Sequence, residues 1–121
     1  MRFKTINQKY RWQISGNRKL RNLLDILDDF TQMFFDKEIV ITSTIRKRVE
    51  GKLSYHPLGQ AVDIRTKDVE DIIVTGWIVM IAAINAQGNN YNFEGKFTWL
   101  HENKGEANEH FHLQLRKGKP V

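Results

Sequence analysis

The sequence predicts an α+β fold, in which a small antiparallel sheet has two main helices packed on one face. Two stretches show the apolar spacing of helices, namely 17–36 and 68 to about 87. Four stretches show the alternation or β-branched content of strands, namely 38–45, 60–66, 96–102 and 110–116. Because the chain has 121 residues, the size of one ordinary core, we expect a single domain over residues 1–121.

The first helix is expected over residues 17–36, and its apolar face would consist of Leu20, Leu23, Leu24, Leu27, Thr31 and Phe34. Asn17 can cap the first turn of this helix. The stretch EIVITSTI, 38–45, is rich in β-branched residues and is expected to be a strand. The polar, glycine-containing stretch 46–59 is then expected to be a loop.

After the alternating strand expected at 60–66, Asp68 can cap the second helix, with Asp71 as its capping-box partner three residues later. The sequence QGNN, 87–90, should end this helix. The last two strands should form a hairpin around the polar loop NKGEANE, 103–109.

Composition narrows the classes of function. The absence of cysteine excludes disulfides, thiolate metal ligands and a cysteine nucleophile. The net charge of +5 fits a polyanion as partner, either nucleic acid or an anionic cell wall, and equally fits a basic domain with no polyanion partner. No aromatic interleaving resembles a nucleic-acid stacking platform. No apolar run at the amino terminus is typical of a signal peptide, and no window is long enough for a transmembrane helix.

The histidines and one aspartate form the clearest candidate site. His110 and His112 are two residues apart on an expected strand, so both imidazoles should lie on one face of the sheet. Asp63 should point out of the core from its own strand, and a sharp turn at Gly59 can bring His56 back beside it. Two imidazoles and one carboxylate leave a tetrahedral Zn²⁺ with one open position, which is the arrangement of catalytic zinc sites.

A carboxylate beside such a site can take a proton from water and pass it to a leaving amine. Two glutamates close to His112 in the sequence are candidates for this role. On an ideal strand Glu109 would face away from His110 and His112, so it needs a bulge or a loop conformation at the strand's first residue to turn inward. Glu106 lies in the expected loop and has no such constraint, so it remains an alternative.

Three stretches together resemble a known family. SYHPLGQAVD at 54–63 matches the pattern SxHxxGxAxD, EHFH at 109–112 contains ExxH, and ITSTIR at 41–46 resembles the strand and arginine before the motif. In these respects the chain is similar to the zinc D-alanyl-D-alanine peptidases. This family includes D-Ala-D-Ala carboxypeptidases, D,D-dipeptidases and the L-alanyl-D-glutamate endopeptidases of phage endolysins, and the Hedgehog signalling domain shares its fold and metal site. The resemblance covers roughly residues 38–116.

The resemblance implies a Hedgehog/D,D-peptidase-like fold and three zinc ligands, which are His56, Asp63 and His112. It implies Glu109 as the catalytic base, with Glu106 as the alternative. Arg46 would hold a substrate carboxylate or the developing oxyanion, a task suited to a planar and permanently charged group. His110 would stabilise the tetrahedral intermediate, and Ser54 would brace the substrate-binding loop.

The function implied is a zinc metallopeptidase that hydrolyses amide bonds in peptidoglycan stem peptides, of carboxypeptidase or endopeptidase type. One alternative is a non-catalytic, zinc-stabilised binding module of the Hedgehog type. A nucleic-acid binder would be supported by net charge alone, so we expect no nucleic-acid partner. We expect a monomer without a membrane span, and anionic cell-wall polymers are a further candidate partner. A cytoplasmic protein of phage or bacterial origin, released to the cell wall, would fit the lack of a signal peptide.

Overall fold

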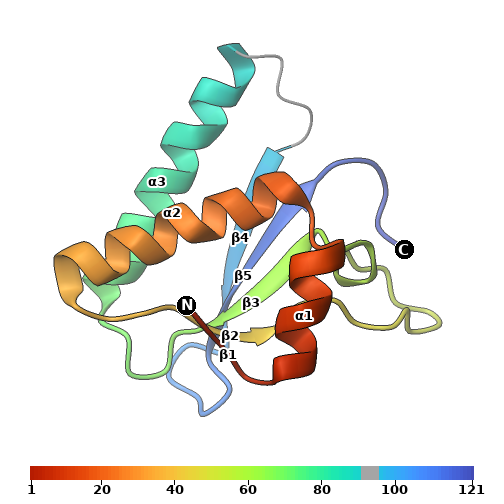
Figure 1. The fold of residues 1–121 in the computed structure, drawn as a ribbon, viewed down its shortest axis with the longest axis horizontal. Helices are drawn as coiled ribbons and strands as arrows, with labels where there is room; N and C mark the ends of the chain where they lie inside the picture. Colours follow the sequence, from red (N-terminus) through yellow and green to blue (C-terminus); the bar gives the residue numbers. More distant parts are fainter. Residues whose placement is uncertain (91–95) are drawn as a thin grey trace.

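The computed structural model describes residues 1–90 and 96–121, in which three helices cover one side of a five-stranded sheet (Figure 1). The strands are β1 (Arg2–Phe3), β2 (Val40–Ser43), β3 (Ala61–Arg65), β4 (Lys96–Glu102) and β5 (His110–Arg116). The helices are α1 (Ile6–Ser15), α2 (Arg18–Phe35) and α3 (Asp71–Asn90), with a short 3₁₀ helix η1 (His56–Leu58). The predicted α+β class is therefore confirmed.

The strand order is β1-β2-β3-β5-β4, and the sheet is mixed rather than wholly antiparallel as predicted. The pairs β2–β3, β3–β5 and β4–β5 are antiparallel, whereas β1 is parallel to β2. The difference arises because α1 and α2 carry the chain from the end of β1 back to the start of β2, and only such a crossover can join parallel neighbours.

Helix α2 begins where the sequence predicts, because the side chain of Asn17 accepts hydrogen bonds from the backbone N–H groups of Lys19 and Leu20. The other two helices differ from the prediction. Helix α1 was not expected, since only Trp12 among its residues is buried and its sequence lacks an apolar stripe. Helix α3 begins at Asp71, and Asp68 is not its cap because Asp68 lies in a left-handed turn with φ of 68°.

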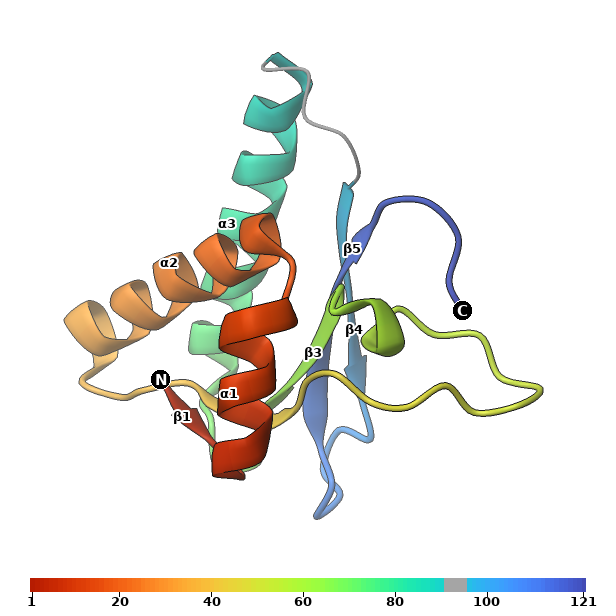
Figure 2. The ribbon, with the colours of Figure 1, turned by 45° about the vertical axis from the view of Figure 1, so that its right-hand side comes forward.

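The core lies between the helices and one face of the sheet. Its fully buried members from β3 and β5 are Val62, Ile64, Phe111, Leu113 and Leu115. Strand alternation then turns Asp63 and His112 to the opposite face. The segment between β2 and β3 and the chain after β5 lie on this second side of the sheet (Figure 2). Among the described residues, no helix combines the length and apolar character that a membrane crossing requires.

Candidate metal centre

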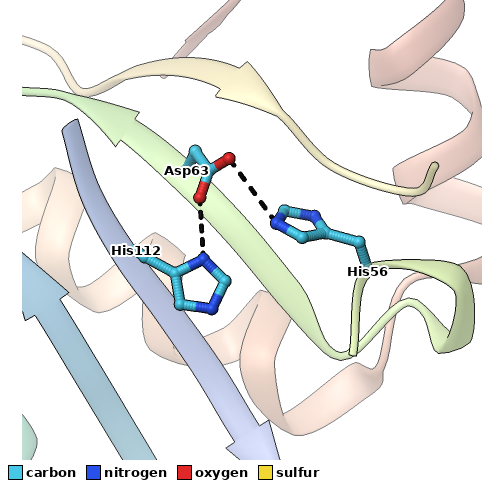
Figure 3. A group of neighbouring side chains, drawn as sticks. All are labelled: His56, Asp63 and His112. Atoms are coloured by element: carbon cyan, nitrogen blue, oxygen red, sulfur yellow. Dashed lines mark hydrogen bonds and ion pairs between the residues drawn. The ribbon is translucent and has the colours of Figure 1, made fainter. Parts of the chain in front are cut away.

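The neighbouring segments η1 and β3 and the distant strand β5 bring His56, Asp63 and His112 together (Figure 3). Asp63 in β3 lies directly opposite His112 in the antiparallel register with β5. His56 comes from the 3₁₀ turn that precedes β3. One ligand atom from each residue lies within 4.8 Å of the others. The sequence-based prediction that these residues lie together therefore agrees with the structure.

The imidazole of His56 is fixed in the tautomer that a metal ligand needs. The side chain is only 1% exposed, and its Nδ1–H donates to the backbone carbonyl oxygen of Thr44. The Nε2 atom on the other side of the ring is buried without a hydrogen-bond partner and lies 3.5 Å from Oδ2 of Asp63. Its lone pair therefore faces the carboxylate, where a cation would satisfy both groups.

His112 is held from both sides of its ring. Its Nδ1 lies 2.8 Å from Oδ1 of Asp63, and its Nε2 lies 2.8 Å from Oε1 of Gln114. Burial lowers the pKa of His112, but the hydrogen bonds to Asp63 and Gln114 outweigh it, and the pKa is raised above its usual value. Burial also acts to raise the pKa of Asp63, but the hydrogen bond from His112 and the electrostatic effect of the two neighbouring imidazoles hold that pKa well below its usual range.

This donor set fits a divalent cation such as Zn²⁺. Thr44 accepts a hydrogen bond from the outer nitrogen of His56, and Gln114 holds the outer nitrogen of His112, so the inner nitrogens of both rings face Asp63. Hydrogen bonds of this kind commonly orient metal-binding histidines. Two imidazoles and one carboxylate are also ligands that zinc accepts.

The three residues lie beside an open hollow of about 460 Å³ that is also lined by Arg46, Ser54, Glu102 and His110. The guanidinium of Arg46 lies 3.9 Å from Oδ2 of Asp63. The Ser54 hydroxyl accepts a hydrogen bond from the backbone N–H of His56, which braces the turn before β3. The predicted site residues Arg46, Ser54 and His110 are thus all in the same hollow as the candidate ligands.

The predicted base Glu109 lies apart from this hollow. Its carboxylate is 2.8 Å from Nε2 of His101 and accepts a hydrogen bond of 3.0 Å from the backbone N–H of Gly105. Hydrogen bonds from Thr66, from Gly105 and from His101 lower the pKa of Glu109 to about 2. The register of β5 with β3 and β4 contains no shift, so no bulge turns Glu109 inward. Glu109 lies in a loop conformation just before β5, but this conformation directs its carboxylate to His101 and Gly105. The alternative base, Glu106, is exposed in the hairpin loop.

The structure brings in one acidic residue that the sequence reasoning missed. Glu102 in β4 lines the hollow, and its Oε1 lies 3.4 Å from Nε2 of His110. The antiparallel register places Glu102 directly opposite His110. Pairing the two predicted hairpin strands residue by residue would have revealed this neighbour, because cross-strand partners share a face of the sheet.

Comparisons of the chain with protein family models, with curated proteins and with solved structures found no match. The support for a metal centre is therefore the geometry of the three side chains, together with the motif at residues 54–63.

The turn that positions His56 depends on Gly59, which has φ of 68° and approaches helix α1 closely. A Cβ atom at this position would lie 2.5 Å from the carbonyl oxygen of Ser15. We expect Gly59→Ala to destabilise the fold by more than the roughly 1–2 kcal/mol cost of a left-handed alanine. Because the clash displaces the turn, zinc affinity should fall as well. Denaturant unfolding and calorimetric zinc titration would measure the two effects.

Gly51→Ala is the matched control for this prediction. Gly51 has φ of 77°, but nothing lies within 4 Å of its added Cβ. Gly51→Ala should therefore lose only the stability that a left-handed alanine costs, and it should bind zinc like the wild type. Equal zinc affinities in the two variants would show that the contact between Gly59 and Ser15 does not position His56.

The effect of zinc on stability should depend on pH. In the metal-free protein the raised pKa of His112 contributes stability below about pH 6.5, which is lost as pH rises through that raised pKa. The lowered pKa of Asp63 contributes stability above about pH 4, which is lost as pH falls. The metal-free pair should therefore stabilise the fold most between about pH 4 and 6.5. Zinc instead needs neutral imidazoles, so its binding should strengthen as pH rises.

Thermal unfolding with zinc and with chelator, from mildly acid to mildly alkaline pH, would measure this difference. At about pH 7.5, zinc a thousandfold above its Kd should add about 4 kcal/mol, or a rise in Tm on the order of 10 °C. This zinc-dependent rise in Tm should become smaller as the pH falls towards about 5. Coincident melting curves at every pH would contradict metal binding at this centre.

Proposed function

We propose that this protein is a zinc metallopeptidase that hydrolyses amide bonds in peptidoglycan stem peptides, built on a Hedgehog/D,D-peptidase-like fold. The observation that carries the proposal is the convergence of His56, Asp63 and His112 beside an open hollow that also holds Arg46 and His110. Structural zinc sites are usually closed by four protein ligands, whereas three ligands and an open approach are typical of catalytic sites. The motif SYHPLGQAVD supports the choice of peptidoglycan peptides as substrates.

A bound zinc ion would supply Lewis-acid activation of water and of the substrate carbonyl. The protein would supply binding and proton transfer. Arg46 is 56% exposed and faces Asp63 at 3.9 Å, a weak pairing that leaves its guanidinium available once a cation neutralises Asp63. Such a fork can bind a substrate carboxylate or the developing oxyanion with two parallel hydrogen bonds.

Glu102 is the proposed proton carrier, because its carboxylate lies in the same hollow as the three candidate ligands. Glu102 would take a proton from the attacking water and pass it to the leaving amine. His110, 3.4 Å from Glu102, would orient this carboxylate and donate to the oxyanion. The resemblance points instead to Glu109, which would have to leave His101 and Gly105 to act.

The proposal is tested by incubating purified peptidoglycan and synthetic stem peptides with the zinc-loaded protein and with the chelated protein. We expect new amino and carboxyl termini only with zinc, and mass spectrometry of the products would identify the bond. Zinc binding without cleavage of any common stem-peptide bond would overturn the proposal and favour a non-catalytic binding module.

A further inference from the structure

Two further hollows adjoin the one beside the candidate metal centre. A second hollow of about 390 Å³ shares Arg46, Leu53, Ser54 and His56 with the first and extends over the segment before η1. A third hollow, also about 390 Å³, shares Asp63 and His110 and extends towards the start of β5. The candidate ligands therefore line the central one of three adjoining hollows, which together are called the groove here.

Cationic side chains line both outer parts of this groove. The part before η1 contains Lys47 and Lys52 in addition to Arg46. The part near β5 contains Lys4, which follows β1, and Arg65 at the end of β3. A chain lying along the groove would meet positive charge on each side of the metal centre, so carboxylates on both sides would complement it.

The acidic side chains nearby offset only part of this charge. Glu109 also lines the part near β5, with its carboxylate held by His101 and Gly105, so one negative charge stands against Lys4 and Arg65 there, while Asp63 would be neutralised by a bound cation. Arg65 has an ion pair with Asp68 at 3.8 Å, but Asp68 is 83% exposed, and such surface pairs are weak. Arg65 can therefore exchange this partner for a substrate carboxylate.

We propose that the substrate is a peptide that passes through the site and carries carboxylates on both sides of the scissile bond. The protein would then cut an internal bond and would not remove a terminal residue. This inference rests on the proposed peptidase function. In the hydrolysis the amide C–N bond breaks, the hydroxyl of water joins the carbonyl carbon, and its proton goes to the leaving amine.

An enzyme that removes a terminal residue needs a boundary next to the reacting bond, with a charged group that holds the free terminus. Among the described cationic side chains of this groove, Arg46 lies beside the candidate ligands, 3.9 Å from Asp63, and could form such a boundary. However, the groove continues past Arg46 to Lys47 and Lys52, so further residues of a substrate have room there. In the part of the groove near β5, Lys4 and Arg65 would be specificity determinants, because they would favour a substrate with an acidic residue there.

The test uses synthetic stem peptides in three forms with the zinc-loaded protein. The first form has free carboxylates on both sides of its internal bonds, and the second has these carboxylates amidated. The third form ends with the residue that directly follows the scissile bond. We expect cleavage of an internal bond in the first form, with lower kcat/KM for the other two. Mass spectrometry of the products and initial rates would give both readouts.

The double variant Lys4→Gln/Arg65→Gln should lower kcat/KM for the first form by about fivefold, because exposed ion pairs are weak. It should leave the amidated form unaffected. The control is Lys96→Gln/Arg116→Gln, an exposed cross-strand pair of β4 and β5 that removes the same charge outside the groove residues. Equal losses in both double variants would overturn the role of Lys4 and Arg65.

Two other outcomes separate this inference from the proposed function. Zinc-dependent release of a terminal residue alone would overturn the inference and leave the peptidase function standing. No cleavage of any of the three forms would overturn both.

Discussion

Replacing Asp63 with asparagine should abolish zinc-dependent hydrolysis while leaving the protein folded. Asp63 is the anionic member of the candidate ligand set, and it lies between the two imidazoles, 2.8 Å from His112 and 3.5 Å from His56. Asparagine keeps the size of the side chain but removes the charge that binds the cation. Because metal activation contributes several kcal/mol, the activity should fall by about a thousandfold or more. Zinc titration and initial rates on peptidoglycan peptides would measure the loss.

A second buried aspartate provides the control. Asp28 is 6% exposed and accepts a hydrogen bond from the backbone N–H of Ile39, on the helical side of the fold. Asp28→Asn should lower stability, since a buried charged acceptor is lost, and should leave the zinc affinity of the folded protein unchanged. If Asp63→Asn bound zinc as tightly as Asp28→Asn, the candidate centre would have to be abandoned.

Replacing Glu102 with glutamine should lower kcat by about a hundredfold to ten-thousandfold, the usual contribution of a positioned acid or base. Zinc affinity should change little, because Glu102 contacts His110 and is not one of the three candidate ligands. Glu109→Gln should retain most of the activity. Its carboxylate already accepts a hydrogen bond from Gly105 and pairs with His101, so its loss should affect the hairpin instead.

The effect of Glu109→Gln on stability should also depend on pH. Because the pKa of Glu109 is lowered to about 2, its ionised form contributes stability above about pH 4.3, and this contribution is lost as pH falls towards 2. The stability difference between wild type and Glu109→Gln should therefore shrink over that range. Loss of activity in Glu109→Gln but not in Glu102→Gln would instead assign the base to Glu109, with a rearranged hairpin in the active protein.

Much of the sheet could be predicted because its residues have local signals. The strands β4 and β5 have the predicted bounds, and β3 differs by one residue at each end, since apolar residues that alternate along a strand identify its buried face. Helix α2 was equally predictable from its leucines and from the cap at Asn17.

The missed elements lack such local signals. Helix α1 is polar apart from a few residues and is held by the packing of Trp12, while β1 has two residues and exists through its pairing with β2. Aspartate is a common N-cap residue, but the turn after β3 gives Asp68 a positive φ. In each case tertiary contacts, which a local pattern does not contain, decide the conformation.

The candidate ligands could be predicted because strand alternation and a glycine turn restrict where His56, Asp63 and His112 can point. The groups that orient these ligands could not be predicted. The hydrogen bond from His56 to Thr44 joins two segments through a backbone carbonyl, which any residue type would supply. The position of Glu102 depends on the register of the β4–β5 hairpin, and this register cannot be predicted before the type and length of the turn are known.

The sequence separation of the candidate ligands has a consequence for the order of events during folding. Asp63 and His112 are 49 residues apart, and they meet only after β3 and β5 have paired. Long-range strand pairing of this kind is slow because a large loop must first close. The cation should therefore enter a nearly finished protein, and its removal and return should be possible without refolding, unlike in zinc fingers, where the metal itself drives the chain to fold.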